Sequence, residues 1–362
     1  MSRRRRSRFL LVLLLAASLV VSIEGAVRLR QWLRYGVTSD DIHNLVEDPV
    51  SGLRVPRPGV IVSRLRQIQV NELGFRGPAL EAPKPAGRLR VAFLGGSTTF
   101  CAEATRDETT WPWLTAEGLG ARFPDVPVDH INAGVAGYTT TTSLRNLERR
   151  VVPHSPDLIV IYHASNDLLR ETRAHAERLG LRSRDSFGPS WLAQRSLAWL
   201  LIEKTLAGAM HTDEGADDER FAFAPSLHAE RFQRDLDALV VASQAAAPVV
   251  ALVTFSHKAR SDQPAAERIR NCESSLQYMP YLTADEVITG IASFNDVIRD
   301  VARGRGAVLI EGEELIPGDD VHFFDSIHLT DAGCALQAER AIRGLADAPA
   351  VRALFEEVRI GG

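Results

Sequence analysis

Cysteine is scarce in this 362-residue sequence, which contains only Cys101, Cys272 and Cys334. So small and odd a count excludes a fold held together by a disulfide framework. At most one pair can form: Cys272 with Cys334 if the compartment is oxidising, with buried free thiols as the alternative. Stability must then come from a hydrophobic core, for which 45% hydrophobic residues is an ordinary share.

The motifs of common cofactor and metal sites are also missing. No Gly-x-Gly-x-x-Gly follows the first predicted strand, and no Gly-Lys-Ser/Thr occurs in the chain. The histidines do not show zinc-ligand spacing, and Gly-x-Ser-x-Gly, which marks the nucleophile of α/β-hydrolases, is absent. We therefore expect no cofactor and no bound metal.

Basic surface is lacking beyond the first few residues. The formal net charge is −4, and no stripe of Lys and Arg runs through the later sequence. Because binding to phosphates needs a basic face, a nucleic-acid partner is not expected.

The N-terminus is the basic exception. Five arginines within residues 3–8 precede an apolar run over residues 9–27, in which Glu24 is the only charge. As a helix this run would span about 28 Å, close to the hydrocarbon thickness of a bilayer. The arginines predict a cytoplasmic start, so residues 9–27 would anchor the chain in the inner membrane, with everything after about residue 30 outside the cytoplasm. A cleaved signal peptide is the alternative.

Five short apolar runs indicate the strands of one sheet. The first run ends just before Gly95, and the other four cover about 126–132, 158–162, 248–255 and 306–310. Helices are predicted at about 110–123, 227–244, 284–303 and 331–345. Strands that are apolar throughout and alternate with helices are typical of a parallel sheet covered on both faces. The predicted fold is a flavodoxin-like three-layer α/β/α sandwich with about five parallel strands.

Changes in this pattern predict the organisation of the chain. Residues 1–30 form the tip and anchor, 31–87 a stalk or collar, 88–346 the α/β domain and 347–362 a C-terminal tail. The alternation breaks at about 168–225, with a helix at 191–209 and a charged loop at 211–220. So long a break between core strands predicts an insertion that caps the site.

Polar residues collect where the predicted strands end. Ser97 follows Gly95-Gly96, Gly137 closes a glycine-bearing loop after the second strand, and Asn166 follows the third. Ligands bind at this edge in open α/β folds. Two glycines before a serine let a substrate carbonyl approach it closely, so Ser97 is the candidate nucleophile, with an ordinary loop as the alternative.

Near the C-terminus, Asp325 stands three residues before His328. A carboxylate at this spacing can accept the Nδ1 proton of the imidazole, which leaves Nε2 to take a proton from a serine. Alone, Asp-x-x-His is more often a surface ion pair or a capping arrangement. The catalytic interpretation of this motif is favoured here because Ser97, the glycine loops and Asn166 precede it in the required order.

Taken in order, these segments resemble the four sequence blocks of the SGNH hydrolases, also called the GDSL esterase superfamily. The blocks are Gly95-Gly96-Ser97, Asn132 to Gly137, Ala164 to Asp167, and Asp325 to Thr330. The resemblance covers about residues 70–345. Asn71 to Gly77 and Asn295 to Ile298 also look like membrane-anchored bacterial members of this group.

The resemblance implies a serine esterase. Ser97 would attack an ester carbonyl, His328 would act as general base and then general acid, and Asp325 would hold the correct tautomer. The oxyanion would be bound by the backbone N–H groups of Ser97 and Gly137 and by the side-chain amide of Asn166.

Two positions depart from the pattern of the family. Gly96 stands where the family often has Asp, and Ala164 where Gly is usual. Both bear on the shape of the pocket and on the rate rather than on the nucleophile. Tyr138, His163 and Asp167 are near the predicted site, and we interpret each as structural.

The expected reaction is cleavage of an O-acyl ester on a small molecule, glycan or lipid of the cell envelope, through an acyl-enzyme. Transfer of the acyl group to a sugar hydroxyl is one alternative. A noncatalytic module that binds a glycan or a protein partner in the same cleft is another. The expected substrate class rests on the inferred location and on the resemblance.

Overall fold

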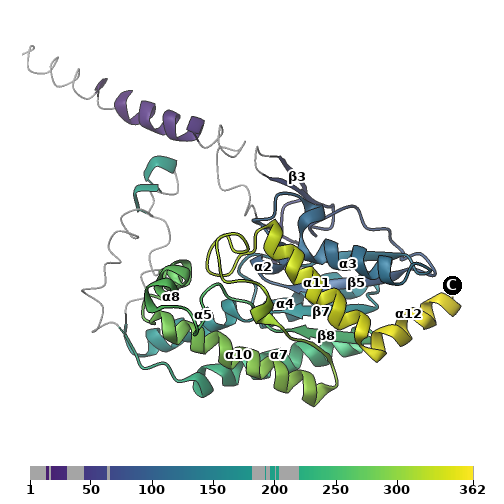
Figure 1. Cartoon of the computed structure of the whole chain (residues 1–362). Coiled ribbons are helices and arrows are strands. Elements are labelled where there is room, and N and C mark those ends of the chain that lie inside the picture. The colour runs from purple at the N-terminus through teal and green to yellow at the C-terminus, as the bar shows by residue number, and fades with distance from the viewer. Residues whose placement is uncertain are drawn as a thin grey trace, which may run out of the picture. The chain divides into compact units, whose positions relative to one another are not determined.

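The computed structural model describes residues 14–15, 18–30, 45–62, 66–181, 192, 196–199, 201–203 and 220–361 (Figure 1). The chain divides into two compact units. The larger comprises residues 42–61, 66–183 and 219–362 and carries the predicted catalytic segments, while the smaller comprises residues 1–41, 62–65 and 184–218.

The smaller unit contains part of the predicted anchor. Residues 18–30 are helical, whereas 9–13, 16 and 17 lie outside the described residues. So do 191, 193–195, 200 and 204–209 of the predicted cap helix and 211–219 of the charged loop. Within the described part of the chain, we find no helix of the length and apolar character that crossing a membrane requires.

Five parallel strands form the sheet of the larger unit, in the order β6-β5-β7-β8-β9. They are β5 Leu89–Gly95, β6 Val128–Asn132, β7 Leu158–Tyr162, β8 Val249–Val253 and β9 Val308–Ile310. Every residue of β5, β7 and β8 is buried, because helices cover both faces of such a sheet. The predicted α/β fold with a five-stranded parallel sheet is confirmed.

Helices pack on both faces of this sheet (Figure 1). One face carries α3 Trp111–Arg122 and α11 Asp331–Asp347, which contact each other. The other carries α4 Thr140–Asn146, α5 Ser165–Arg178, α7 Pro225–Ala246 and α10 Ala284–Arg305. The helices predicted from about residues 110, 227, 284 and 331 are therefore present, with ends within a few residues of those expected.

Helix α3 turns Trp111 toward the sheet. Trp111 is fully buried, whereas Trp113 and Leu114 are only partly buried. Trp111, Thr115 and Leu119 share the inner face because residues four apart lie on one side of a helix.

The direction in which the chain crosses the sheet reverses beside β5. The connection from β5 leads to β6 on one side, and the chain then returns to β7 on the other side. The crevice beyond the carboxyl ends of β5 and β7 is therefore a topological switch point, where open α/β sheets bind their ligands.

Residues 45–87 contain more regular structure than the predicted stalk. Strands β1 Leu45–Glu47 and β2 Arg54–Pro56 pair antiparallel, and β3 Gly59–Val62 and β4 Gln67–Val70 form a second small sheet. These strands are only three or four residues long, and a periodicity of two is hard to recognise over so few residues.

The predicted C-terminal tail is a helix, α12 Pro349–Gly361. Its buried residues Val351, Leu354 and Phe355 have the three- and four-residue spacing of one helical face. The ring of Phe355 stacks on Phe123 with the centroids 4.1 Å apart. The end of the chain therefore contributes to the core.

All three cysteines are free and buried. The pairing of Cys272 with Cys334 is thus absent, and the alternative of buried thiols holds. Burial raises the pKa of Cys272 to about 12. A hydrogen bond with the Cys101 thiol, together with burial, raises the pKa of Cys334, so its thiol neighbour is Cys101.

Candidate active site

Three of the predicted site residues form a hydrogen-bonded chain. Ser97 begins the short helix α2 Ser97–Phe100, directly after β5. Its Oγ lies 2.8 Å from Nε2 of His328, and Nδ1 of His328 lies 2.7 Å from Oδ2 of Asp325. These distances are within the reach that transfer of a proton from serine to imidazole requires. The catalytic roles of the three residues stay predictions.

Asp325 and His328 lie on a tight turn between β9 and α11. The Oδ1 atom of Asp325 accepts the backbone N–H groups of Ile327, at 2.9 Å, and of His328, at 2.8 Å. The N–H of Phe324 donates to the carbonyl of His328 at 2.8 Å. One carboxylate oxygen therefore holds the turn while the other holds the imidazole.

The pKa shifts of this pair favour the charged state. Burial lowers the pKa of His328, but the hydrogen bond and charge of Asp325, together with the charge of Glu103, raise it above its ordinary 6.5. Burial raises the pKa of Asp325, and the hydrogen bond and charge of His328 bring it below its ordinary 3.8. An imidazolium beside a carboxylate is the state reached once His328 has taken the serine proton.

Two of the predicted oxyanion donors lie on neighbouring segments, Gly137 on the loop after β6 and Asn166 in the first turn of α5. The side-chain amide of Asn166 donates to the carbonyl of Tyr138, the residue after Gly137, at 2.9 Å. Because an amide carries two N–H bonds, this contact orients the group and leaves the second N–H for an oxyanion. Gly137 has a φ of +80°, which a residue without a Cβ adopts without strain.

Gly96 is closely packed against Asn166. A Cβ atom at position 96 would lie 2.6 Å from Nδ2 of Asn166 and 3.4 Å from the carbonyl oxygen of Tyr138. The first separation is well inside van der Waals contact. The departure from the family pattern thus has a structural consequence: the amide of Asn166 occupies the space that an Asp side chain would enter.

A buried carboxylate joins the two segments that carry Gly137 and Asn166. Asp167, beside Asn166, accepts the backbone N–H of Thr140 at 3.1 Å and its hydroxyl at 2.7 Å. Burial raises the pKa of Asp167 to about 6, against the hydrogen bonds from Thr140 and the charge of Arg170. Asp167 therefore ties the start of α5 to the start of α4.

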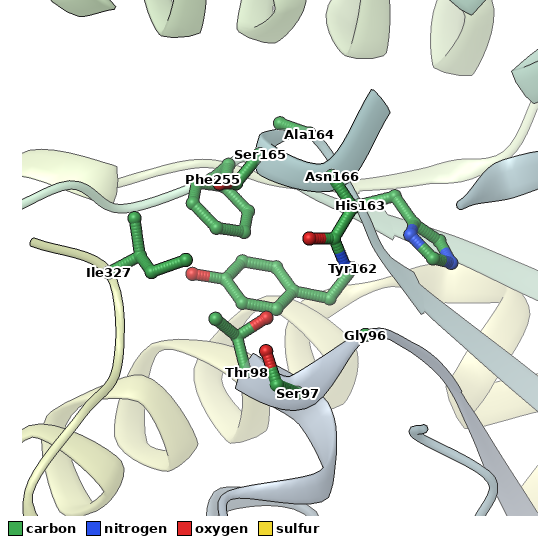
Figure 2. A pocket seen from close by; sticks show the side chains of 10 residues that line it. All are labelled: Gly96, Ser97, Thr98, Tyr162, His163, Ala164, Ser165, Asn166, Phe255 and Ile327. Carbon is green, nitrogen blue, oxygen red and sulfur yellow. The ribbon is translucent and has the colours of Figure 1, made fainter. Parts of the chain in front are cut away.

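His163 and Tyr138 contact the scaffold rather than the reacting groups. Nε2 of His163 lies 2.8 Å from the hydroxyl of Ser143, and the ring points away from Ser97 (Figure 2). Burial lowers the pKa of His163 to about 3, so the ring is neutral. The hydroxyl of Tyr138 donates to the carbonyl of Arg54 at 2.8 Å. These contacts agree with a structural interpretation of both side chains.

Arg76 lies in the predicted collar, and no sequence pattern assigned it a role. It is buried, and its Nε lies 2.7 Å from Oδ1 of Asp107. Its Nη1 donates to the carbonyls of Phe100, at 2.9 Å, and of Cys101. Arg76 thus holds the end of the short helix that begins with Ser97, and its only signal in the sequence was the likeness of residues 71–77 to anchored relatives.

The sequence also did not indicate what holds the turn around Ser326. The hydroxyl of Ser326 accepts the N–H of Ser275 at 3.2 Å, and its own N–H donates to the hydroxyl of Ser274 at 3.0 Å. Its carbonyl accepts the N–H of Lys258 at 2.9 Å. Both serine partners lie on α9 Glu273–Tyr278, which follows α8 Ala265–Asn271.

A small pocket opens beside Ser97 (Figure 2). Ser97, Asn166, Tyr162, Phe255 and Ile327 line it, together with the backbone around Ala164, the second departure from the family pattern. Its empty volume is about 210 Å³, including the part open to solvent. Among the described residues, no group of three or more His, Cys, Asp or Glu side chains is arranged to hold a metal ion.

A family model matches most of this domain. The model of the GDSL-like Lipase/Acylhydrolase family matches residues 93–336, which is more than half of the chain. The chain therefore belongs to this family, in agreement with the resemblance of its four blocks. Family membership makes the protein a serine esterase. Among curated proteins, no significant match was found.

Two solved structures of enzymes have a fold similar to that of this chain. The acetylxylan esterase Axe2 from Geobacillus stearothermophilus is 15% identical, with a TM-score of 0.43 over 75% of this chain and 99% of that one. LAE5, an alpha/beta hydrolase from the metagenome of Lake Arreo in Spain, is 16% identical, with a TM-score of 0.42 over 73% of this chain and 97% of that one.

Proposed function

We propose that this protein hydrolyses O-acyl esters through a covalent acyl-enzyme on Ser97. The observation that carries the proposal is the 2.8 Å separation of Ser97 Oγ and His328 Nε2, with Asp325 on the other imidazole nitrogen. Family membership gives the reaction class, and this geometry supplies a nucleophile and a base for it.

In the proposed mechanism, His328 takes the proton of Ser97 while Oγ forms a bond to the ester carbonyl carbon. The negative charge on the carbonyl oxygen would be met by the N–H groups of Ser97 and Gly137 and by the amide of Asn166. His328 then gives its proton to the leaving alcohol. Water, deprotonated by the same imidazole, releases the acid and restores the serine.

Turnover of p-nitrophenyl acetate and labelling by a fluorophosphonate test this mechanism. We expect the wild-type chain to show both, and Ser97→Ala to lose labelling and nearly all turnover while keeping its thermal unfolding midpoint. A folded wild-type chain that reacts with neither probe would overturn the proposal and leave the noncatalytic binding module as its replacement.

The substrate we propose is an acyl ester on a glycan or lipid of the cell envelope. The arginine-rich start and the apolar run over residues 9–27 support an inner-membrane anchor with the catalytic domain on the extracytoplasmic side. Sodium carbonate extraction of membranes and proteolysis of spheroplasts test this location. We expect the full chain to stay with the membrane pellet and to be cut by external protease; release into the soluble fraction would contradict it.

A further inference from the structure

We propose that the pocket beside Ser97 receives the acyl group and restricts it to about the size of acetyl. This inference rests on the proposed function and adds the class of acyl group. It depends on three features of the pocket: the side of Ser97 on which it lies, its size and the rigidity of its walls.

The pocket lies on the side of Ser97 that suits the acyl part of an ester. His328 must face the leaving alcohol in order to protonate it. The described lining residues include Ser97 and Asn166 but not His328. Figure 2 shows the Ser97 hydroxyl, the Asn166 amide and the Tyr162 ring around one space, with Ile327 to one side of it. A carbonyl oxygen held by Asn166 would leave the rest of the acyl group facing this space.

The space is small. The empty volume is about 210 Å³, and this figure includes open solvent at the mouth of the pocket. The pocket has room for about one water-sized group. A methyl group is of that size, whereas a butyryl or longer chain would have to displace the wall.

The wall is fixed by contacts that hold it in place. The hydroxyl of Tyr162 accepts the backbone N–H of Ser256 at 3.1 Å. Its ring stacks on Phe255 with the centroids 4.8 Å apart and meets the edge of Trp111 at 5.6 Å. Tyr162 and Phe255 are 1% and 2% exposed. Because close-packed interiors do not yield to an extra methylene without strain, this side of the pocket does not widen for a longer chain.

Ile327 is the apolar part of the wall that packs at the margin of the core. It is only partly buried, and it lies between Asp325 and His328 on the turn whose backbone Asp325 already holds. Shortening its side chain would extend the pocket toward solvent. Ile327 is therefore the residue that we expect to set the limit on acyl length.

The test compares kcat/KM of the full-length chain for the p-nitrophenyl esters of acetate, butyrate and octanoate. For the wild type we expect a drop of about tenfold or more from acetate to butyrate, the size of effect that misfit of a methylene or two produces, and a further drop to octanoate. Ile327→Ala should raise the butyrate-to-acetate ratio by about tenfold, mainly through butyrate.

Val321→Ala is the matched control, because Val321 is 64% exposed on the same loop and is not among the described lining residues. Its ratio should equal that of the wild type. A wild-type chain that cleaves octanoate as well as acetate would overturn the inference while leaving the proposed function intact. So would an unchanged ratio in folded Ile327→Ala. Absence of turnover with all three esters and of fluorophosphonate labelling would instead overturn the proposed function.

Discussion

The two halves of the candidate site are positioned in different ways. Ser97, Gly137 and Asn166 follow β5, β6 and β7, which are neighbours in the sheet. Asp325 and His328 follow β9, which is separated from β5 by β7 and β8. The sheet alone therefore brings the nucleophile and the oxyanion donors together. The turn that carries Asp325 and His328 must instead reach back over two strands to lie beside Ser97.

Hydrogen bonds between loops hold the segment with Asp325 and His328 in this position. Asp331, the first residue of α11, accepts the N–H of Thr105 and the hydroxyl of Thr109, each at 2.8 Å. The turn at Ser326 is held by α9 and by the N–H of Lys258. One half is therefore positioned by the strands of the core. The other combines core packing of Phe323 and Leu329 with a few polar contacts that can be removed singly.

The largest effect is expected where the two halves meet. His328→Ala removes the base on which Ser97 depends, and we expect kcat for p-nitrophenyl acetate to fall by about 10⁴-fold or more. Thermal unfolding should change little because the side chain is partly exposed. His322→Ala, on the same loop, is the control and should keep most of the activity. Substantial turnover by folded His328→Ala would show that another group acts as base.

On the strand-positioned half, Gly96→Ala should lower kcat by about 10²–10³-fold, as loss of one oxyanion donor does. The new Cβ would lie 2.6 Å from Nδ2 of Asn166 and would move that amide. Steady-state kinetics of Gly96→Ala, Asn166→Ala and the double variant should show effects that do not add. Gly120→Ala is the control, because its nearest neighbouring atoms would be 3.9 Å away. Full activity of Gly96→Ala would contradict the predicted role of Asn166.

On the loop-positioned half, Ser326→Ala should have a smaller effect. The buried N–H of Ser275 loses its acceptor, which costs about 1–3 kcal/mol in the free energy of unfolding. The turn keeps its other contacts, so kcat should fall less than about tenfold. Denaturant titration and kinetics measure both. Ser293→Ala, whose hydroxyl donates to the carbonyl of Gly290 within α10 at 2.8 Å, should change neither. A loss in kcat as large as that of Gly96→Ala would make the two halves equally sensitive.

The smallest expected effect is on the pH profile. Turnover requires neutral His328, and its pKa lies above 6.5, so activity should fall with decreasing pH around a midpoint above that value. Glu103→Gln should move the midpoint of kcat/KM downward, because the charge of Glu103 raises the pKa of His328 and the remaining Arg66 lowers it. Glu117→Gln, on the exposed face of α3, should leave the midpoint unchanged. An upward shift in Glu103→Gln would contradict this electrostatic account.

The same division explains what the sequence could predict. Apolar strands that end in Gly95-Gly96-Ser97 and before Asn166 carry a strong local pattern, so the sheet and the residues at its edge could be read from the sequence. The contacts of Ser326 and Arg76 join segments far apart in the chain, and no periodicity marks them. Asp325 and His328 were recognised as candidates through their spacing and the family resemblance, but the sequence did not show what holds their turn in place.

The contacts of Arg76 bear on where an expressed fragment of the domain should start. The family model starts at residue 93, yet Arg76 donates to the backbone at the end of the helix that starts with Ser97. A recombinant fragment cut at the family boundary would lack this side chain, and the buried carboxylate of Asp107 would lose its ion pair with Arg76. It would also lack residues 89–92 of the central strand β5. Expression of such a fragment would remove part of the support of the nucleophile together with the collar.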